Sequence, residues 1–450
     1  MARIVVVAPP FAGHLQPALA LARRLARDHD LAFFSSAAAA PRIEAAGIRA
    51  VASRTASDAE IDAIVTGASA AKNNPFALAR QVRGNVALMR RFTAEFAAFL
   101  DAEAPELVIA DFAAPVAGFV ARERGIAWWT SHASPAAIET PDGPPAYLGG
   151  LRPARGAYGR ARDALGRAAV RTTKRALFAA FAAPLRSFGM PAMYRADGTE
   201  HIYSPECVLA LGYPELEFAT RFPRSVRFVG PAAFAPERPG YEAPPLGAGP
   251  NVLVTIGTQA PWFTERMWRA VRAAARACPG VTFHFTTGGA PITGLATTAT
   301  TANAVCVPYV RYETDVARYD LVVHHAGTGI LNAVLHAGVP SLAYPLDYDQ
   351  FDCAARLEEA GLARRVRRLG RLDVAVREAL ASAALRDACR AFARDVVPRY
   401  DAPETVAALV AAFMERRARE RCVAPGPRAR ADAASAASRD RDPSGREAPS

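Results

Sequence analysis

Short apolar runs alternate with amphipathic stretches along the first half of the chain. Continuous apolar runs of this length are typical of strands buried on both faces, and the stretches between them repeat apolar residues at helical spacing. The expected strands are residues 4–8, 31–35, 107–111 and 126–130, and the expected helices are 14–28, 76–101 and 115–124. Strands separated by helices predict a parallel sheet covered on both faces. Residues 135–200 interrupt this alternation and are expected to form loops and helices beside a cleft.

The alternation restarts after residues 233–250, which are too dense in Pro and Gly for regular structure and are predicted to be a linker. The second set of expected strands is 252–256, 281–286, 321–324 and 341–344, and the helices are 263–277, 329–337 and 352–360. We therefore predict an α/β chain with two doubly wound, Rossmann-like domains, residues 1–232 and 251–395, that face each other across a cleft. A helix at 396–420 is expected to pack back on the first domain, and residues 421–450 to be a disordered tail.

The composition fits a globular chain of two domains. It has 450 residues, of which 51% are hydrophobic and 22% charged. No apolar run reaches the roughly 18 residues that a membrane helix needs, and residues 1–8 are interpreted as a first strand instead of a signal peptide. The six cysteines form no C-x-x-C pair, so neither a zinc site nor a disulfide framework is predicted, and a cytoplasmic location is expected.

The net charge of +11 is unevenly placed. Residues 152–186 hold eight Arg and one Lys against a single acid, Asp163. This stretch is either a solvated helix face or a peripheral contact with an anionic membrane surface or a lipid-like acceptor. Nucleic acid is not expected as a partner, because no interleaved aromatics or binding motif accompany the basic run.

A buried strand, a glycine turn and a helix follow one another near residues 321–337. The helix N-terminus supplies free N–H groups and a positive dipole end, which suit an anionic diphosphate. His325 adds a side-chain donor, and Gly327, Thr328 and Gly329 form a turn where the backbone can come close to a ligand. A Gly-x-Gly pair alone is as often a plain tight turn, and His324 is interpreted as a packed strand residue.

A second phosphate contact is expected after the strand at 252–256. There Gly257 precedes Thr258, which offers a hydroxyl and an N–H. Two such turns at the ends of two strands predict a diphosphate site at the edge of the second sheet.

His14 follows the first strand and opens the first expected helix. Transfer to a hydroxyl needs a base near neutral pH, and histidine is the side chain suited to that role. Asp111 ends another strand and is placed to orient His14, as the acid of a catalytic triad does. On the residues alone, the alternative is a packed or capping histidine and an aspartate that caps the next helix.

These turns are followed by Gly338-Val339-Pro340 and by Asp349-Gln350. Over about residues 3–415 the chain resembles the family 1 glycosyltransferases, in the bacterial branch related to macrolide and plant UDP-glycosyltransferases. The resemblance implies the GT-B architecture, with a nucleotide sugar held mainly by the second domain. It implies that His14 is the acceptor base, that Asp111 is its partner and that His325 contacts the diphosphate. It also places Asp349 and Gln350 on the sugar hydroxyls, and Val307 with the donor residues.

The chain departs from the family pattern at three positions. Ala333 stands where a Glu often grips both ribose hydroxyls, Ile330 where Ser or Thr is common, and Cys306 where plant members stack a Trp on the base. Loss of the ribose carboxylate leads to the hypothesis of a dTDP-sugar donor. A UDP-sugar held by Asn332 or by backbone groups remains the alternative.

The expected function is inverting transfer of a sugar to a hydroxyl of a lipophilic small molecule or lipid. No acidic cluster is placed to hold a divalent ion, so neither a metal nor a cofactor is expected. Acceptor contacts are expected among the aromatic residues of the first domain, with these candidates: Phe11, Phe76, Trp128, Trp129 and Phe181.

Three other functions compete with glycosyl transfer. A non-catalytic helper protein would explain the substitutions at Ile330 and Ala333. A dinucleotide-dependent oxidoreductase is disfavoured, because the first strand is not followed by G-x-G-x-x-G and no acidic ribose reader follows Gly329 at the expected distance. A nucleotide-sugar epimerase would need further cleft carboxylates, which the sequence does not supply.

Overall fold

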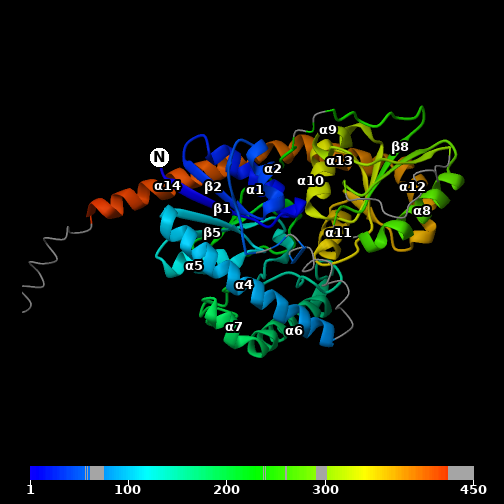
Figure 1. Cartoon of the computed structure of the whole chain (residues 1–450). Helices are drawn as coiled ribbons and strands as arrows, with labels where there is room; N and C mark the ends of the chain where they lie inside the picture. Colours follow the sequence, from blue (N-terminus) through cyan, green and yellow to red (C-terminus); the bar gives the residue numbers. More distant parts are fainter. Residues whose placement is uncertain are drawn as a thin grey trace, which may run out of the picture. The chain divides into compact units, whose positions relative to one another are not determined.

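Two parallel sheets form the framework of the protein (Figure 1). The computed structural model describes residues 1–55, 57, 59–60, 75–236, 238, 240–258, 261–289 and 302–423. Residues 1–405 form one compact unit that contains both sheets, and residues 406–450 form a second unit. The predicted α/β class with parallel sheets is confirmed.

The first sheet has seven strands in the order β3-β2-β1-β4-β5-β6-β7, and every neighbouring pair is parallel. The strands are β1 (Arg3–Val7), β2 (Asp30–Ser35), β3 (Arg49–Ala52), β4 (Leu107–Asp111), β5 (Ala127–His132), β6 (Cys207–Ala210) and β7 (Val226–Phe228). The chain winds outward in both directions from the neighbouring strands β1 and β4, with Val7 opposite Ala110. This reversal is a topological switch point, where ligands of doubly wound sheets bind at the carboxyl ends.

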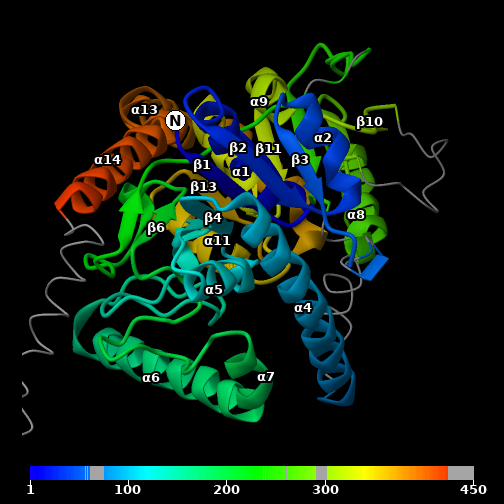
Figure 2. The same cartoon turned by 60° about the vertical axis from the view of Figure 1, so that its left-hand side comes forward.

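Helices cover this sheet and extend beyond it. They are α1 (Ala12–Leu25), α2 (Ala40–Ala45), α4 (Pro75–Glu103), α5 (Pro115–Glu123), α6 (Gly156–Ala180) and α7 (Ala182–Ser187). The helices α4 and α5 pack against each other and α5 packs on β4 and β5, over a core that includes Phe34, Phe96 and Trp128. The neighbouring helices α6 and α7 lie outside this layer (Figure 2).

The second sheet has six parallel strands in the order β10-β9-β8-β11-β12-β13. The strands are β8 (Asn251–Thr255), β9 (Thr282–Thr286), β10 (Ala304–Cys306), β11 (Leu321–His324), β12 (Ser341–Ala343) and β13 (Ala363–Arg365). Its switch point lies between β8 and β11, where His324 is opposite Thr255. The carboxyl ends of these two strands carry the two turns for which a diphosphate site was predicted.

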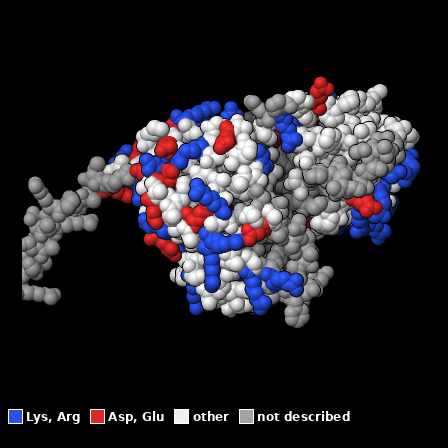
Figure 3. Space-filling model, viewed as in Figure 1, with Lys and Arg blue, Asp and Glu red and all other residues white. Residues whose placement is uncertain are grey.

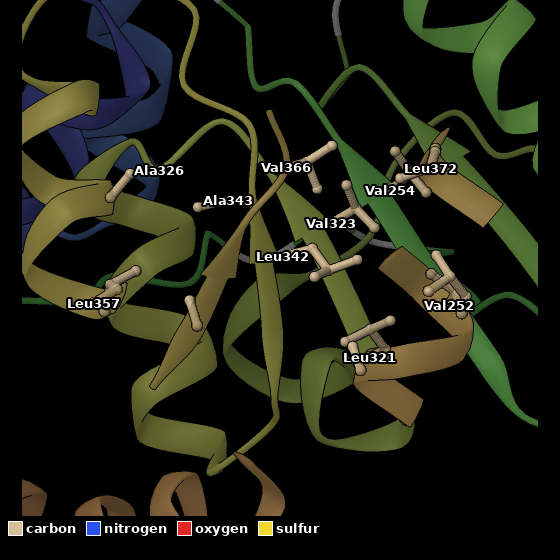
Figure 4. Close-up of a cluster of buried hydrophobic side chains, with 14 of the residues drawn as sticks. Val252, Val254, Leu321, Val323, Ala326, Leu342, Ala343, Leu357, Val366 and Leu372 are labelled. Carbon is tan, nitrogen blue, oxygen red and sulfur yellow. The ribbon is translucent and has the colours of Figure 1, made fainter. Parts of the chain in front are cut away.

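The helices of the second half are α8 (Thr264–Ala277), α9 (Tyr312–Asp315), α10 (Thr328–Ala337), α11 (Gln350–Glu359), α12 (Leu372–Ala381), α13 (Ala383–Asp395) and α14 (Ala402–Val423). Residues two apart on a strand point to the same face of the sheet. Val252 and Val254 on β8 therefore pack with Leu321 and Val323 on β11, and Leu372 of α12 joins the same buried cluster (Figure 4). This packing fixes the strand ends from which the site is built.

Most of the predicted strands and helices lie within a few residues of observed ones, but the helices α2, α9, α12 and α13 and five strands were missed. Four of them, β3, β7, β10 and β13, are short and only partly buried, so they lack the continuous apolar run of an inner strand. The fifth, β6, is buried but has only four residues and follows the irregular segment. The predicted domain boundaries remain predictions, and residues 424–450 of the predicted tail lie outside the described part of the chain.

Candidate active site

A cleft of about 390 Å³ joins the carboxyl ends of the two sheets. It lies where both switch points meet, and α1 also packs against α10 from the other half of the chain. Nine of the residues predicted for the site line this cleft: His14, Gly257, Thr258, His325, Gly327, Thr328, Gly329, Asp349 and Gln350. Side chains from sequence-distant turns therefore face one cavity.

His14 lies in the first turn of α1, directly after β1. Its Nδ1 is 2.8 Å from Oδ1 of Asp111, which ends β4 and is 2% exposed. The same carboxylate oxygen accepts a hydrogen bond from the N–H of Ala113 at 2.8 Å. Since a carboxylate accepts, His14 donates from Nδ1, which leaves Nε2 with a lone pair for a proton.

Burial lowers the pKa of His14, but the charge and hydrogen bond of Asp111, together with the charge of Asp349, more than offset this effect. The pKa of His14 therefore lies above the ordinary value of 6.5. A base must be neutral to take a proton, so this raised pKa shifts the pH at which His14 becomes an effective base upward.

An aromatic stack supports the imidazole of His14 from the side. The ring of Phe112, which follows Asp111, is 5.1 Å from the ring of His14 and 4.2 Å from that of His132, on which it stacks. Burial lowers the pKa of His132 to about 3, so this second histidine is a neutral, fully buried support for Phe112. The sequence reasoning missed both residues, because nothing in their spacing marks them.

The ring of His325 fills the space between two glycines. A Cβ at Gly257 would lie 2.7 Å from its Cε1, and a Cβ at Gly327 would lie 2.3 Å from its Nε2. Gly257 also has a left-handed backbone, with φ of +67°. A Cβ at Gly329 would meet nothing within 4 Å. Two of the three glycines are thus needed to accommodate the imidazole, in addition to any close approach of backbone to ligand.

His325 is neutral in the described structure. Burial lowers its pKa to about 4, although the backbone of Thr255 opposes this shift. Its Nδ1 is buried without a hydrogen-bond partner. A neutral ring in this position can donate one hydrogen bond to an anionic ligand. His324, interpreted as a packed strand residue, is fully buried, and its Nδ1 accepts from the N–H of Ala326 at 3.0 Å.

Backbone strain is concentrated at this cleft. Among the described residues, four residues other than glycine have a positive φ. Three of them are Ala326 (66°), Tyr348 (49°) and Tyr147 (65°). Ala326 stands inside the glycine turn, while Tyr348 and Tyr147 line the cleft. Such conformations cost about 1–3 kcal/mol each and persist where surrounding structure imposes them, which is common at binding sites.

Asp349 and Gln350 lie at the start of α11. Burial raises the pKa of Asp349, while Ser134 and His14 across the cleft oppose the shift. The side-chain oxygen of Gln350 accepts from the N–H groups of Leu346 at 2.9 Å and Asp347 at 3.0 Å. Gln350 therefore shapes the loop before α11 with its oxygen and has its amide nitrogen left for a ligand.

The remaining predicted residues lie elsewhere. Val307 is buried in a cluster with Val310 and Ile330 beside the cleft, and does not line it. Of the aromatic acceptor candidates, Phe11 lines the cleft. Phe181 is partly buried where α6 meets α7, and the side chain of Phe76 lies outside the described residues.

Trp128 and Trp129 were candidates for the acceptor pocket, with a place in the core as the favoured alternative, and the structure places both in the core. They are 2% and 3% exposed, because β5 is an inner strand of the sheet. A Cβ at Gly118 of α5 would overlap the ring of Trp128, so that ring packs directly on the helix backbone.

Several cleft residues were not predicted: Ser134, Tyr147, Tyr309, Tyr312 and Glu313. The hydroxyl of Tyr312 lies 2.6 Å from Oγ1 of Thr255, at the end of β8. Partial burial raises the pKa of Glu313.

Within the described ranges, no three His, Cys, Asp or Glu side chains are grouped so that they could hold a metal ion. None of the described helices combines the length and apolar composition needed to cross a bilayer.

No family model matches the sequence. A zeaxanthin glucosyltransferase from Pseudescherichia vulneris is 32% identical over 185 residues, which are 41% of this chain and 43% of that protein. An O-mycaminosyltylonolide 6-deoxyallosyltransferase from Streptomyces fradiae is 33% identical over 152 residues, 32% of this chain and 34% of that protein. The chain thus spans less than half the length of the curated relatives that it matches.

Solved structures match over nearly the whole chain. The glycotransferase of kitacinnamycin has a TM-score of 0.70 at 21% identity and covers 91% of this chain and 98% of its own. The calicheamicin glycosyltransferase CalG4 has a TM-score of 0.66 at 21% identity, covering 94% and 100%. The chain has the GT-B glycosyltransferase fold. The predicted GT-B architecture and the resemblance to bacterial natural-product glycosyltransferases are both confirmed. Another GT-B structure, the spinosyn rhamnosyltransferase SpnG complexed with thymidine diphosphate, has a TM-score of 0.61 at 18% identity, covering 92% and 100%.

Proposed function

We propose that the protein is an inverting glycosyltransferase that moves a sugar from a nucleoside-diphosphate sugar to a hydroxyl of a small-molecule acceptor. One observation carries the proposal: the His14–Asp111 pair and the two glycine turns around His325 face the same cleft. The first supplies a base and the second a place for a pyrophosphate. Neither part alone distinguishes a transferase from other Rossmann-like proteins.

In the proposed reaction, His14 takes the acceptor proton at Nε2 while the acceptor oxygen attacks the anomeric carbon. The nucleoside diphosphate leaves from the opposite face, so the anomeric configuration inverts. Asp111 fixes the tautomer of His14 and stabilises the imidazolium that forms. The N–H groups at the start of α10, together with His325 and Thr258, stabilise the charge of the leaving group, so that no metal ion is needed.

For the donor we propose a dTDP-sugar, with a UDP-sugar as the alternative. Ala333 on α10 offers no carboxylate to a ribose 2′-hydroxyl, and the spinosyn rhamnosyltransferase of the same fold is described as a complex with thymidine diphosphate. Glu313 favours the alternative UDP-sugar, because its carboxylate lines the cleft and its helix α9 packs against α10. A carboxylate there could accept hydrogen bonds from ribose.

Competition binding of UDP against dTDP tests this donor proposal. We expect dTDP to bind at least as tightly as UDP, since deoxyribose has no 2′-hydroxyl that the missing carboxylate would bind. UDP that binds at least about tenfold tighter, a difference of about 1.4 kcal/mol, would contradict the proposal. If replacing Glu313→Gln then removes the UDP advantage, Glu313 is the reader of the 2′-hydroxyl.

Incubation with a panel of nucleotide sugars tests the function itself. We expect slow hydrolysis of the accepted donor, detected as free nucleoside diphosphate, and faster release when a suitable alcohol is added. His14→Ala is expected to cut transfer by about 10²-fold or more, the scale of a lost general base. Transfer at the wild-type rate in His14→Ala would refute the assignment, and a chain that turns over no donor would be a non-catalytic helper.

A further inference from the structure

A second, smaller cavity of about 180 Å³ adjoins the cleft. Ala137 and Tyr147 line both cavities, so the two cavities adjoin at Tyr147. The walls of the smaller cavity come from the segment after β5 and from α6. They combine apolar side chains with hydrogen-bonding ones: Ile138, Pro144, Pro145 and Val170 on one hand, Glu139, Arg171 and Lys174 on the other.

The polar end of this cavity is a closed ion-pair network. Lys174 lies 2.7 Å from Glu139 and 2.6 Å from Glu200, and Arg171 is 3.5 Å from Glu139. The hydroxyl of Tyr194 also donates to Glu139 at 2.7 Å. Arg167, the third cation of the lining, donates to the carbonyl oxygen of Gly143. Since each of the three cations already has a partner, the cavity suits a neutral hydrogen-bonding group better than an ion.

The backbone of Tyr147 is held in an unfavourable conformation by a residue from the other half of the chain. Its φ is +65°, a strained value for a bulky residue. Its N–H donates to Oδ2 of Asp352 at 2.8 Å. Asp352 is 2% exposed and lies in the first turn of α11, whereas Tyr147 is 48% exposed. The carboxylate thus fixes the backbone, and the side chain remains open to a ligand.

The same segment is packed closely on α11 at further points. A Cβ at Gly150 would lie 2.1 Å from the carbonyl oxygen of Phe351, so the two backbones touch. Arg152 pairs with Glu358 at 2.6 Å, near the end of α11. Asp349, predicted to hold the donor sugar, immediately precedes this helix. One helix therefore contacts both the predicted donor site and the wall formed by Tyr147.

We propose that Tyr147 is a specificity-determining residue for the acceptor and that Asp352 is its positioning residue. The acceptor is then an amphipathic alcohol: its reacting hydroxyl lies at His14, an apolar body passes the ring of Tyr147, and a neutral hydrogen-bonding end enters the smaller cavity. This inference rests on the proposed glycosyl transfer. It narrows the lipophilic acceptor that the sequence predicted to one with a polar far end.

Two matched alcohols test the inference: 4-hydroxybiphenyl and its 4′-carboxamide, which differ only at the far end. We expect the wild type to transfer sugar to both, with the lower KM for the carboxamide. Asp352→Ala removes the carboxylate that holds the backbone of Tyr147 and should raise the KM of the carboxamide about tenfold while kcat changes little, the scale of one lost hydrogen bond to a charged group. Tyr147→Ala removes the ring beside the shared biphenyl body and should raise the KM of both compounds, again with little change in kcat. Asp352→Asn should give an intermediate KM, because an amide oxygen still accepts.

Asp373→Asn on α12 is the control, since this carboxylate pairs with an exposed Arg377 at 2.8 Å, and it should leave the KM unchanged. Equal KM values for the two alcohols in the wild type, or a wild-type KM in Asp352→Ala, would overturn the inference. A lower kcat at constant KM in Tyr147→Ala would do so too, and this exposed residue carries the test if Asp352→Ala does not fold. Donor hydrolysis without transfer to either alcohol overturns the acceptor inference alone, whereas no hydrolysis at all overturns the proposed function.

Discussion

At the scale of single residues, the state of His14 depends on its neighbours. Asp111 and Asp349 both raise the pKa of His14 against the effect of burial. A base must be neutral to accept a proton, so activity should be lost as the pH falls through this raised pKa. The acidic limb of the rate profile is therefore expected above pH 6.5, the ordinary value for histidine.

Replacing Asp111→Asn tests this dependence. We expect kcat to fall by about 10²-fold, because the imidazolium loses its partner and the tautomer is no longer fixed. The acidic limb should move to lower pH, because the negative charge that raised the pKa is gone. The measurement is the pH dependence of kcat/KM for transfer.

Asp101→Asn is the matched control, because this aspartate at the end of α4 is 61% exposed and pairs with Arg124. If Asp111→Asn leaves the limb in place, His14 is not the group whose titration limits the rate.

At the scale of elements, the strand-turn-helix unit from β11 to α10 determines the donor site. His325 ends up inside the turn because Gly257 and Gly327 leave room for its ring. The sequence predicts the turn and its glycines, and attributes the glycines to the approach of the backbone to phosphate. The structure adds the clearance of the imidazole as a second reason.

Gly327→Ala tests whether glycine is needed for the imidazole of His325 or for the approach of the backbone to phosphate. Its Cβ would lie 2.3 Å from Nε2 of His325, so the ring must move. A displacement of about 1 Å at a positioning group can cost about 10²-fold in rate, and we expect a loss of that order in donor turnover. Gly329→Ala, whose Cβ meets nothing within 4 Å, should have a much smaller effect. Equal losses in the two variants would mean that backbone approach to the ligand, and not the ring, sets the need for glycine.

The basic stretch 152–186 has several of its cations paired with acids. Most of it forms α6. Figure 3 shows mainly blue charged side chains along the lower edge of the view, where α4, α6 and α7 lie (Figure 1). Several cations of the stretch are nevertheless paired with acids from other segments, as Lys174 is with Glu200 and Arg155 with Glu359. Paired charges attract an anionic surface less than free ones, so these pairings weaken the attraction of the stretch to such a surface. A membrane contact here remains a prediction without support from these pairings.

At the scale of the whole molecule, buried contacts join the two sheets. Arg356 on α11 donates from Nε to Glu217, which follows β6, at 2.8 Å, and their side chains are 10% and 6% exposed. Burial raises the pKa of Glu217, while Arg356 opposes this. The guanidinium also lies 4.7 Å from the ring of Phe218. Arg356 is on the same helix that begins at Gln350, directly after Asp349.

Glu217→Gln leaves the charge of Arg356 buried without its partner. We expect the free energy of unfolding to fall by about 3 kcal/mol, the usual cost of breaking a buried pair, and Tm to fall with it in calorimetry. The double variant Glu217→Gln with Arg356→Met removes both charges and should recover much of the loss. A single variant as stable as the wild type would show that water reaches the pair.

The sequence by itself determined the fold class, the two restarting series of strands and helices, and the turns at which His14 and His325 stand. These features are local: the period of apolar residues sets strand or helix, and glycine sets where a turn can form. Only the tertiary structure decided which distant side chains meet. Tyr147 and Asp352 are separated by 205 positions, and Trp128 became core because other strands flank β5 on both sides. Such contacts depend on strand order and on how one sheet packs near the other, and no local pattern encodes them.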